Sequence, residues 1–147
     1  MSLTKIVGQF FKPRQYALEK HYTQPEALQE AVLRHLLERG SNTEYGRNHL
    51  LSPKNSYEEF AKNVPINTYE ELKRDIDRMR HGEADVLWPG QVQWYAKSSG
   101  TTNDKSKFIP VSAEGLHDIH YQGGKDVVTF YLRNNPNSRL FDGKSLI

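Results

Sequence analysis

The residues best suited to chemistry lie in one short run, Tyr95–Lys107, between two apolar segments. Within this run, hydroxyl side chains and three lysines surround a single glycine, Gly100. A glycine among small hydroxyl residues lets backbone N–H groups come close to a polyanion, and Lys107 at the far end supplies a positive charge. The run therefore predicts a phosphate-binding loop. It matches neither the Walker A pattern nor a dinucleotide-binding fingerprint, and an ordinary exposed loop has the same composition.

A β-hairpin is expected to carry this loop. Val92, Trp94 and Ala96 alternate with more polar residues, which is the period of a half-buried strand. Residues 108–111 form the expected partner strand, and Pro110 confines this strand to an edge or an end. The connection between the two strands is longer than a tight turn requires, and such extra length favours a functional loop.

Two helices are predicted ahead of the hairpin because each begins with a capping box, a Ser or Thr followed three residues later by Glu. The motifs are Ser56-Tyr57-Glu58-Glu59, before a helix at 57–62, and Thr68-Tyr69-Glu70-Glu71, before a helix at 69–80. The second helix has an apolar stripe of Leu72, Ile76 and Met79 and ends at Gly82. Its charged residues, 73–80, are expected to form a solvated face with internal ion pairs.

Three further helices are expected from the spacing of apolar residues. The first covers residues 3–16, and Pro13 is expected to interrupt it. The second begins at a cap on Thr23 and covers residues 25–39, with a core side of Leu28, Ala31, Val32, His35 and Leu36. The third begins at Ser112 and continues to about Arg133, with a core side of Leu116, Ile119, Val127, Val128, Tyr131 and Leu132. Residues 145–147 are expected to begin another strand.

The composition excludes several classes of function. The 147 residues are 36% apolar and 26% charged, and the net charge of +2 gives no electrostatic case for nucleic acid or a membrane surface. The absence of cysteine excludes disulfide and thiol chemistry, and a cytoplasmic location is expected. His117 and His120 lie three residues apart, but a metal site needs three or four ligands, so none is predicted. Trp88, Trp94 and Tyr95 are expected to pack in the core or on the strand face.

The loop and its surroundings together resemble a known family. Ser98, Ser99, Gly100, Thr101 and Lys107 match in register the phosphate-binding motif of the GH3 family of acyl-acid-amido synthetases, a group of acyl-adenylate-forming enzymes that includes the auxin-responsive GH3 proteins. Thr102 replaces the serine that usually ends the hydroxyl run. The flanking segments also resemble the family, namely Val64–Leu72, Asp77–Glu83, Leu87–Gly90 and Phe108–Pro110.

The resemblance implies an ATP-dependent ligase that uses Mg²⁺, adenylates a carboxylic acid and joins it to an amino acid. It implies that Ser98, Ser99 and Thr101 donate hydrogen bonds to phosphate, that Gly100 permits close backbone approach, and that Lys107 supplies charge. Thr102 belongs to the same loop. By resemblance, the fold class is mixed α/β, residues 1–147 form the N-terminal part of the large adenylation domain, and the C-terminal domain is absent. The chain alone is therefore expected not to catalyse the reaction.

Two alternatives stay open at this level. One is a different adenylate-forming ligase that transfers the acyl group to coenzyme A. The other is a non-catalytic binding or scaffold module in which the loop is only a turn. Asp104 favours the second alternative, because it stands where the family usually has a second glycine and adds negative charge near the expected triphosphate.

Overall fold

The computed structural model describes residues 2–99 and 106–144, which fold into two compact units. One unit combines the chain up to Leu28 with the chain from His117, and the other is Gln29–Leu116. The described part is rich in helix and contains a two-stranded antiparallel sheet, as the mixed class predicts. The strand expected at 145–147 lies outside the described residues. None of the described helices is both long and apolar enough to cross a membrane.

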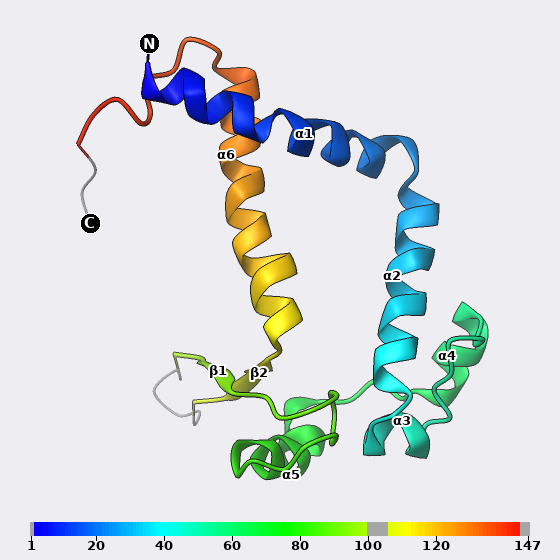
Figure 1. Cartoon of the computed structure of the whole chain (residues 1–147). Helices are drawn as coiled ribbons and strands as arrows, with labels where there is room; N and C mark the ends of the chain where they lie inside the picture. The colour runs from blue at the N-terminus through cyan, green and yellow to red at the C-terminus, as the bar shows by residue number, and fades with distance from the viewer. Residues whose placement is uncertain (1, 100–105, 145–147) are drawn as a thin grey trace. The chain divides into compact units, whose positions relative to one another are not determined.

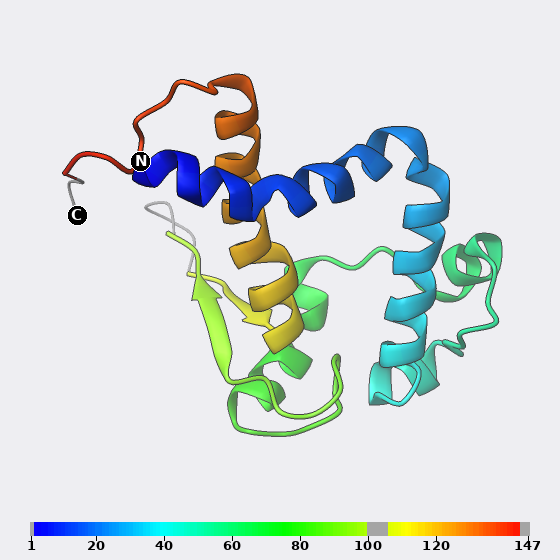
Figure 2. The same cartoon turned by 45° about the horizontal axis from the view of Figure 1, so that its top comes forward.

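The unit Gln29–Leu116, which we call the central unit because it lies in the middle of the sequence, carries the hairpin. Its elements are α2 (Pro25–Gly40, which begins in the other unit), α3 (Glu44–Asn48), α4 (Tyr57–Asn63), α5 (Tyr69–Arg80), β1 (Trp94–Lys97) and β2 (Phe108–Val111). Strand β2 lies against α5, as both views of the chain show (Figure 1, Figure 2). A core of Met79, Val86 and Val92 packs beneath the partly buried Leu87, Trp88 and Tyr95. The hairpin therefore rests on the same apolar cluster as the end of α5.

Both predicted capping boxes are confirmed. Ser56 accepts a hydrogen bond at Oγ from the Glu59 N–H at 3.2 Å, and its own N–H donates to the Glu59 carboxylate at 2.8 Å. The Thr68 N–H donates to the Glu71 carboxylate at 2.6 Å, and this bond is the main reason that the pKa of Glu71 lies below its ordinary value. The predicted end of α5 is also confirmed, because Gly82 adopts a left-handed conformation with φ +91°.

The short helix α3 was not predicted from the sequence, since five residues are too few to show an apolar period. It is fixed instead by buried polar contacts. Thr43 is 1% exposed, donates from Oγ1 to the Gly40 carbonyl at 2.7 Å and accepts from the Gly46 N–H at 2.9 Å. The Tyr45 N–H donates to the Val86 carbonyl at 3.0 Å, which ties α3 to the segment that forms the core.

The core side predicted for α2 is wrong. Leu37 is 2% exposed and forms the buried contact, whereas Val32 and Leu36 are exposed in this unit. The helix itself ends at Gly40, close to the predicted boundary. The spacing of apolar residues thus located the helix but not the face that it buries, because two candidate stripes overlap on the same short segment.

In the other unit, α1 (Leu3–Thr23) packs across α6 (Gln122–Asn134), which the two views agree in showing (Figure 1, Figure 2). Pro13 does not interrupt α1, contrary to expectation. The missing N–H of a proline removes one helical hydrogen bond, yet α1 continues to Thr23 and packs on α6. The cap predicted at Thr23 is also wrong: Thr23 is the last residue of α1, and its hydroxyl donates to the Glu19 carbonyl at 3.2 Å.

The helix predicted from Ser112 begins as expected, with the Gly115 N–H donating to Ser112 Oγ at 2.9 Å. It is not a uniform α-helix, however, because Gly115–Tyr121 forms a π-helix, η1, before α6. The wider turns of a π-helix change the angular position of every later side chain. Thr129 and Leu132 are buried and Leu116 and Val128 are partly buried, while Ile119, Val127 and Tyr131 are exposed, so half of the predicted core side is wrong.

Replacing Asp126 by asparagine is expected to lower the free energy of unfolding at neutral pH by about 1–2 kcal/mol, the range for partly exposed hydrogen bonds to a charged group. Arg14 on α1 donates from Nε and Nη2 to the two Asp126 oxygens at 2.6 and 2.8 Å. These bonds hold the pKa of Asp126 below its ordinary value. The stabilisation is therefore present above the ordinary Asp pKa and is lost as the pH falls through the lower folded-state pKa.

Urea unfolding of wild type and Asp126→Asn over a pH series measures this effect. The difference between the two proteins should shrink toward acid pH. Asp118→Asn is the matched control, because Asp118 is exposed on η1 of the same unit. An Asp126→Asn difference that does not change with pH would contradict the ionic role of the pair.

Candidate functional site

The predicted loop is closed at its base by the hairpin and by one further pair of hydrogen bonds. The strands pair from Trp94 with Val111 to Lys97 with Phe108. Beyond the last pair, the Ser98 N–H donates to the Lys107 carbonyl at 2.9 Å, and the Lys107 N–H donates to Ser98 Oγ at 2.9 Å. We call this pair, Ser98 and Lys107, the neck of the loop. A side chain replaces a backbone carbonyl there, so the ladder of backbone hydrogen bonds ends at the neck.

The predicted phosphate-binding residues divide into two groups. Ser98, Ser99 and Lys107 are described, and the neck brings Ser98 and Lys107 together although they are nine positions apart. Ser98 Oγ accepts a hydrogen bond from Lys107, which leaves its own O–H able to donate. Ser99 is exposed at the start of the loop. Gly100, Thr101 and Thr102 lie outside the described residues.

Helix α5 contacts the far side of the neck through its first residue. The Tyr69 hydroxyl accepts a hydrogen bond from the Phe108 N–H at 3.1 Å. The Lys107 ammonium lies over the Tyr69 ring, with Nζ 5.6 Å from the ring centre. The sequence places Tyr69 in a capping box and in the family-like segment Val64–Leu72, but it does not predict these contacts, because the partners are nearly forty positions away.

Besides Lys107, a cation from α5, Arg80, lies beside the start of β2. The Arg80 guanidinium carbon is 3.8 Å from the centre of the Phe108 ring, close enough for a cation–π contact. Arg80 also forms an ion pair with Asp77 at 3.2 Å. Asp77 pairs with Lys73 at 2.9 Å as well, and the hydrogen bond from Lys73 is the main cause of its lowered pKa. Lys107, over the Tyr69 ring, and Arg80, over the Phe108 ring, therefore both place positive charge near the start of β2.

The aromatic residues near the loop take the packing roles that were predicted. Trp88 and Tyr95 pack on the core of the central unit, and Trp94 is 45% exposed on the strand face. The Tyr95 hydroxyl oxygen is buried, and burial raises its pKa. It has no hydrogen-bond partner among the described residues.

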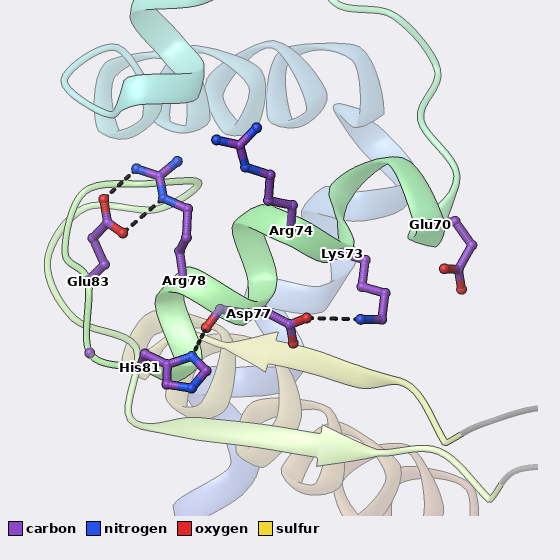
Figure 3. A pocket seen from close by; sticks show the side chains of 8 residues that line it. Glu70, Lys73, Arg74, Asp77, Arg78, His81 and Glu83 are labelled. Atoms are coloured by element: carbon purple, nitrogen blue, oxygen red, sulfur yellow. Dashed lines mark hydrogen bonds and ion pairs between the residues drawn. The ribbon is translucent and has the colours of Figure 1, made fainter.

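A shallow charged surface of the central unit lies along α5 and is distinct from the loop. Figure 3 shows its lining residues as sticks, with Arg78 facing Glu83 and with Lys73 facing Asp77. Arg78 binds Glu83 and also donates to Glu44 at 2.6 Å and to Asp75 at 3.1 Å. The pKa of Glu83 lies below its ordinary value mainly because of its hydrogen bond from Arg78. The predicted solvated face with internal ion pairs is thus confirmed, and its charges largely satisfy one another.

His117 and His120 contact an aromatic residue in the structure. Their rings lie 5.6 and 5.5 Å, centre to centre, from the Tyr121 ring. No group of three or more metal-ligating side chains occurs within residues 2–99 and 106–144. The two histidines therefore give no reason to place a metal there.

Comparison with protein families gives a match over most of the chain. Residues 14–147 match the family described as "GH3 family N-terminal domain". The chain is 36% identical over 100 residues to indole-3-acetic acid-amido synthetase GH3.15 of Arabidopsis thaliana, covering 67% of this chain and 17% of that protein. It is 34% identical over 100 residues to indole-3-acetic acid-amido synthetase GH3.2 of the same plant, covering 67% of this chain and 18% of the relative.

A rice protein is similar over nearly the same length. This protein is the probable indole-3-acetic acid-amido synthetase GH3.2 of Oryza sativa subsp. japonica, 32% identical over 92 residues that cover 62% of this chain and 15% of the relative. The chain therefore spans less than a fifth of the length of these three relatives.

Proposed function

The chain belongs to the GH3 family, and from this premise we propose that it forms the N-terminal part of the adenylation domain of an acid–amino acid ligase. In this proposal, the loop between Ser98 and Lys107 holds the phosphates of ATP. The relatives are named amido synthetases for indole-3-acetic acid, which is consistent with a small carboxylic acid and an amino acid as substrates.

The neck is the observation that supports the proposal. It places the Ser98 hydroxyl, whose oxygen accepts from Lys107, together with the exposed Ser99 and the lysine at the base of one loop. A polyphosphate needs several hydrogen-bond donors and a positive charge within a short distance, and this set supplies both.

The chemistry proposed for the whole enzyme has two balanced steps. A carboxylate oxygen attacks the α-phosphorus of ATP, and pyrophosphate leaves as the acyl-adenylate forms. The amine of an amino acid then attacks the acyl carbon, and AMP leaves with the bonding electrons while the nitrogen loses a proton. In the first step, donors on the loop stabilise the charge that grows on the departing pyrophosphate and keep it in line with the attacking carboxylate.

Mg²⁺ is expected to arrive with ATP and to reduce the negative charge on its phosphate oxygens. The described residues at the neck are hydroxyls and a lysine, which suit phosphate oxygens rather than a divalent cation. We therefore assign no protein ligand to the ion, and every role given to this chain is a contact with phosphate.

Isothermal titration of the chain with Mg·ATP tests the proposal. Lys107→Ala is expected to weaken binding by about tenfold, the loss of one charge-assisted contact, and Ser99→Ala by a smaller factor. Lys62→Ala on α4 is the charge-matched control, because Lys62 is exposed and lies on a different helix. If Lys107→Ala and Ser99→Ala both leave the affinity for Mg·ATP unchanged, the loop is not part of the ATP site, and a scaffold role is favoured.

A further inference from the structure

Tyr69 makes two contacts with the base of the loop, and these contacts use different parts of the side chain. The hydroxyl accepts a hydrogen bond from the Phe108 N–H at 3.1 Å. The ring lies beneath the Lys107 ammonium at 5.6 Å. Because the two partners are consecutive residues, one side chain contacts both the start of β2 and the lysine that precedes it.

The position of Tyr69 is itself fixed by the capping box of α5. Thr68 binds the Glu71 carboxylate through its N–H at 2.6 Å and through its hydroxyl at 2.7 Å, which holds the first turn of the helix in place. The far end of α5 is held in the core by Met79, which is 2% exposed. Tyr69, at the first helical position, therefore has a defined location relative to the hairpin, and its ring provides a fixed surface for the Lys107 ammonium.

We propose that Tyr69 is a positioning residue of the phosphate loop, which holds Lys107 by its ring and β2 by its hydroxyl. The inference rests on the proposed function in so far as Lys107 contacts phosphate. Tyr69 acts through Lys107 and is assigned no contact with the phosphate. Its role is to reduce the number of orientations open to the lysine, so that less conformational freedom is lost when a phosphate binds.

The chain contains a closely matched control. Tyr57 also occupies the first position of a helix and follows a capping box of the same pattern, Ser-Tyr-Glu-Glu against Thr-Tyr-Glu-Glu. Its side chain is 67% exposed. Substitutions at Tyr57 therefore measure the effect of the residue type at a helix start without the contacts to the loop.

The experiment compares the full chain with four single variants, Tyr69→Phe, Tyr69→Leu, Tyr57→Phe and Tyr57→Leu. In the first stage, all of these proteins are measured in the absence of phosphate. Tyr69→Phe keeps the ring and removes the hydroxyl, so the Phe108 amide should exchange with solvent about fivefold faster, the worth of one net hydrogen bond. The NMR shifts of the Lys107 side-chain protons, which the ring moves upfield, should be retained in Tyr69→Phe and lost in Tyr69→Leu. The Tyr57 variants should change neither signal.

In the second stage, inorganic triphosphate is titrated into the same proteins. Tyr69→Leu is expected to weaken binding about two- to fivefold, the contribution of a cation–π contact near the surface, and Tyr69→Phe should restore the wild-type affinity. Lys107 shifts that are unchanged in Tyr69→Leu would overturn the inference even if triphosphate binds well. Loss of those shifts in Tyr69→Leu, with no triphosphate binding by wild type, would uphold the positioning role and refute the proposed function.

Discussion

Gly46→Ala is expected to lower the free energy of unfolding by about 3 kcal/mol or more, because the added methyl group has no space. A Cβ atom at this position would lie 1.9 Å from the Gly40 carbonyl oxygen and 2.8 Å from its carbon. Both atoms belong to the backbone, so no side chain can rotate away. The same carbonyl accepts hydrogen bonds from Thr43 Oγ1 at 2.7 Å and from the Thr43 N–H at 3.0 Å, and a shift would weaken both.

Urea unfolding followed by circular dichroism measures the change, and Gly124→Ala is the matched control. A Cβ at Gly124 has no heavy atom within 4 Å among the described residues, and the position is helical. Alanine there should raise the free energy of unfolding by about 0.5–1 kcal/mol. A Gly46→Ala protein as stable as wild type would show that α2 and α3 do not approach each other as closely as described.

Met79→Ala is expected to lower the free energy of unfolding by about 2–5 kcal/mol, the cost of a cavity at a fully buried position. Met79 is 2% exposed and packs with Val86 and Val92 at the centre of the core. Tyr95 of β1 lies on this cluster, so the cavity opens beneath the hairpin that carries the loop. The amide protons of β1 and β2 should therefore exchange faster as well.

The measurement combines urea unfolding with amide exchange of the hairpin. Met79→Leu, which nearly conserves the volume, should cost less than about 1.5 kcal/mol. Val127→Ala provides a surface reference, since Val127 is 70% exposed, and should change stability by no more than about 0.5 kcal/mol. Equal effects of Met79→Ala and Val127→Ala would contradict the assignment of the core.

Local features of the structure could be predicted well from the sequence. The two capping boxes, the stop at Gly82, the cap at Ser112 and the two strands all depend on residues within a few positions of one another. The hydrogen bonds of the caps form between neighbours along the chain, and the strands show a local alternation of residue types, so the local sequence suffices to predict them. The family resemblance also follows from residue order and spacing, and the match over residues 14–147 confirms it.

Errors arose where the folded chain overrides local preference. Pro13 favours a break in α1, but the helix continues from Leu3 to Thr23 and packs on α6. The core side of the last helix was assigned with a constant helical period, which η1 changes. In α2 the spacing allowed two faces, and only the tertiary contact selects Leu37. Each of these outcomes depends on an element distant in sequence or on a change in helix type.

The sequence by itself determined the family, the caps at Ser56, Thr68 and Ser112, and the hairpin. Only the tertiary structure decided which residues support the loop: Tyr69 beneath Lys107, Arg80 on Phe108, and Met79 beneath Tyr95. The physical reason is the range of the interactions. Caps join residues a few positions apart and the hairpin joins two strands through a single loop, whereas the supports come from α5 and contact the hairpin only after the chain has folded back on itself.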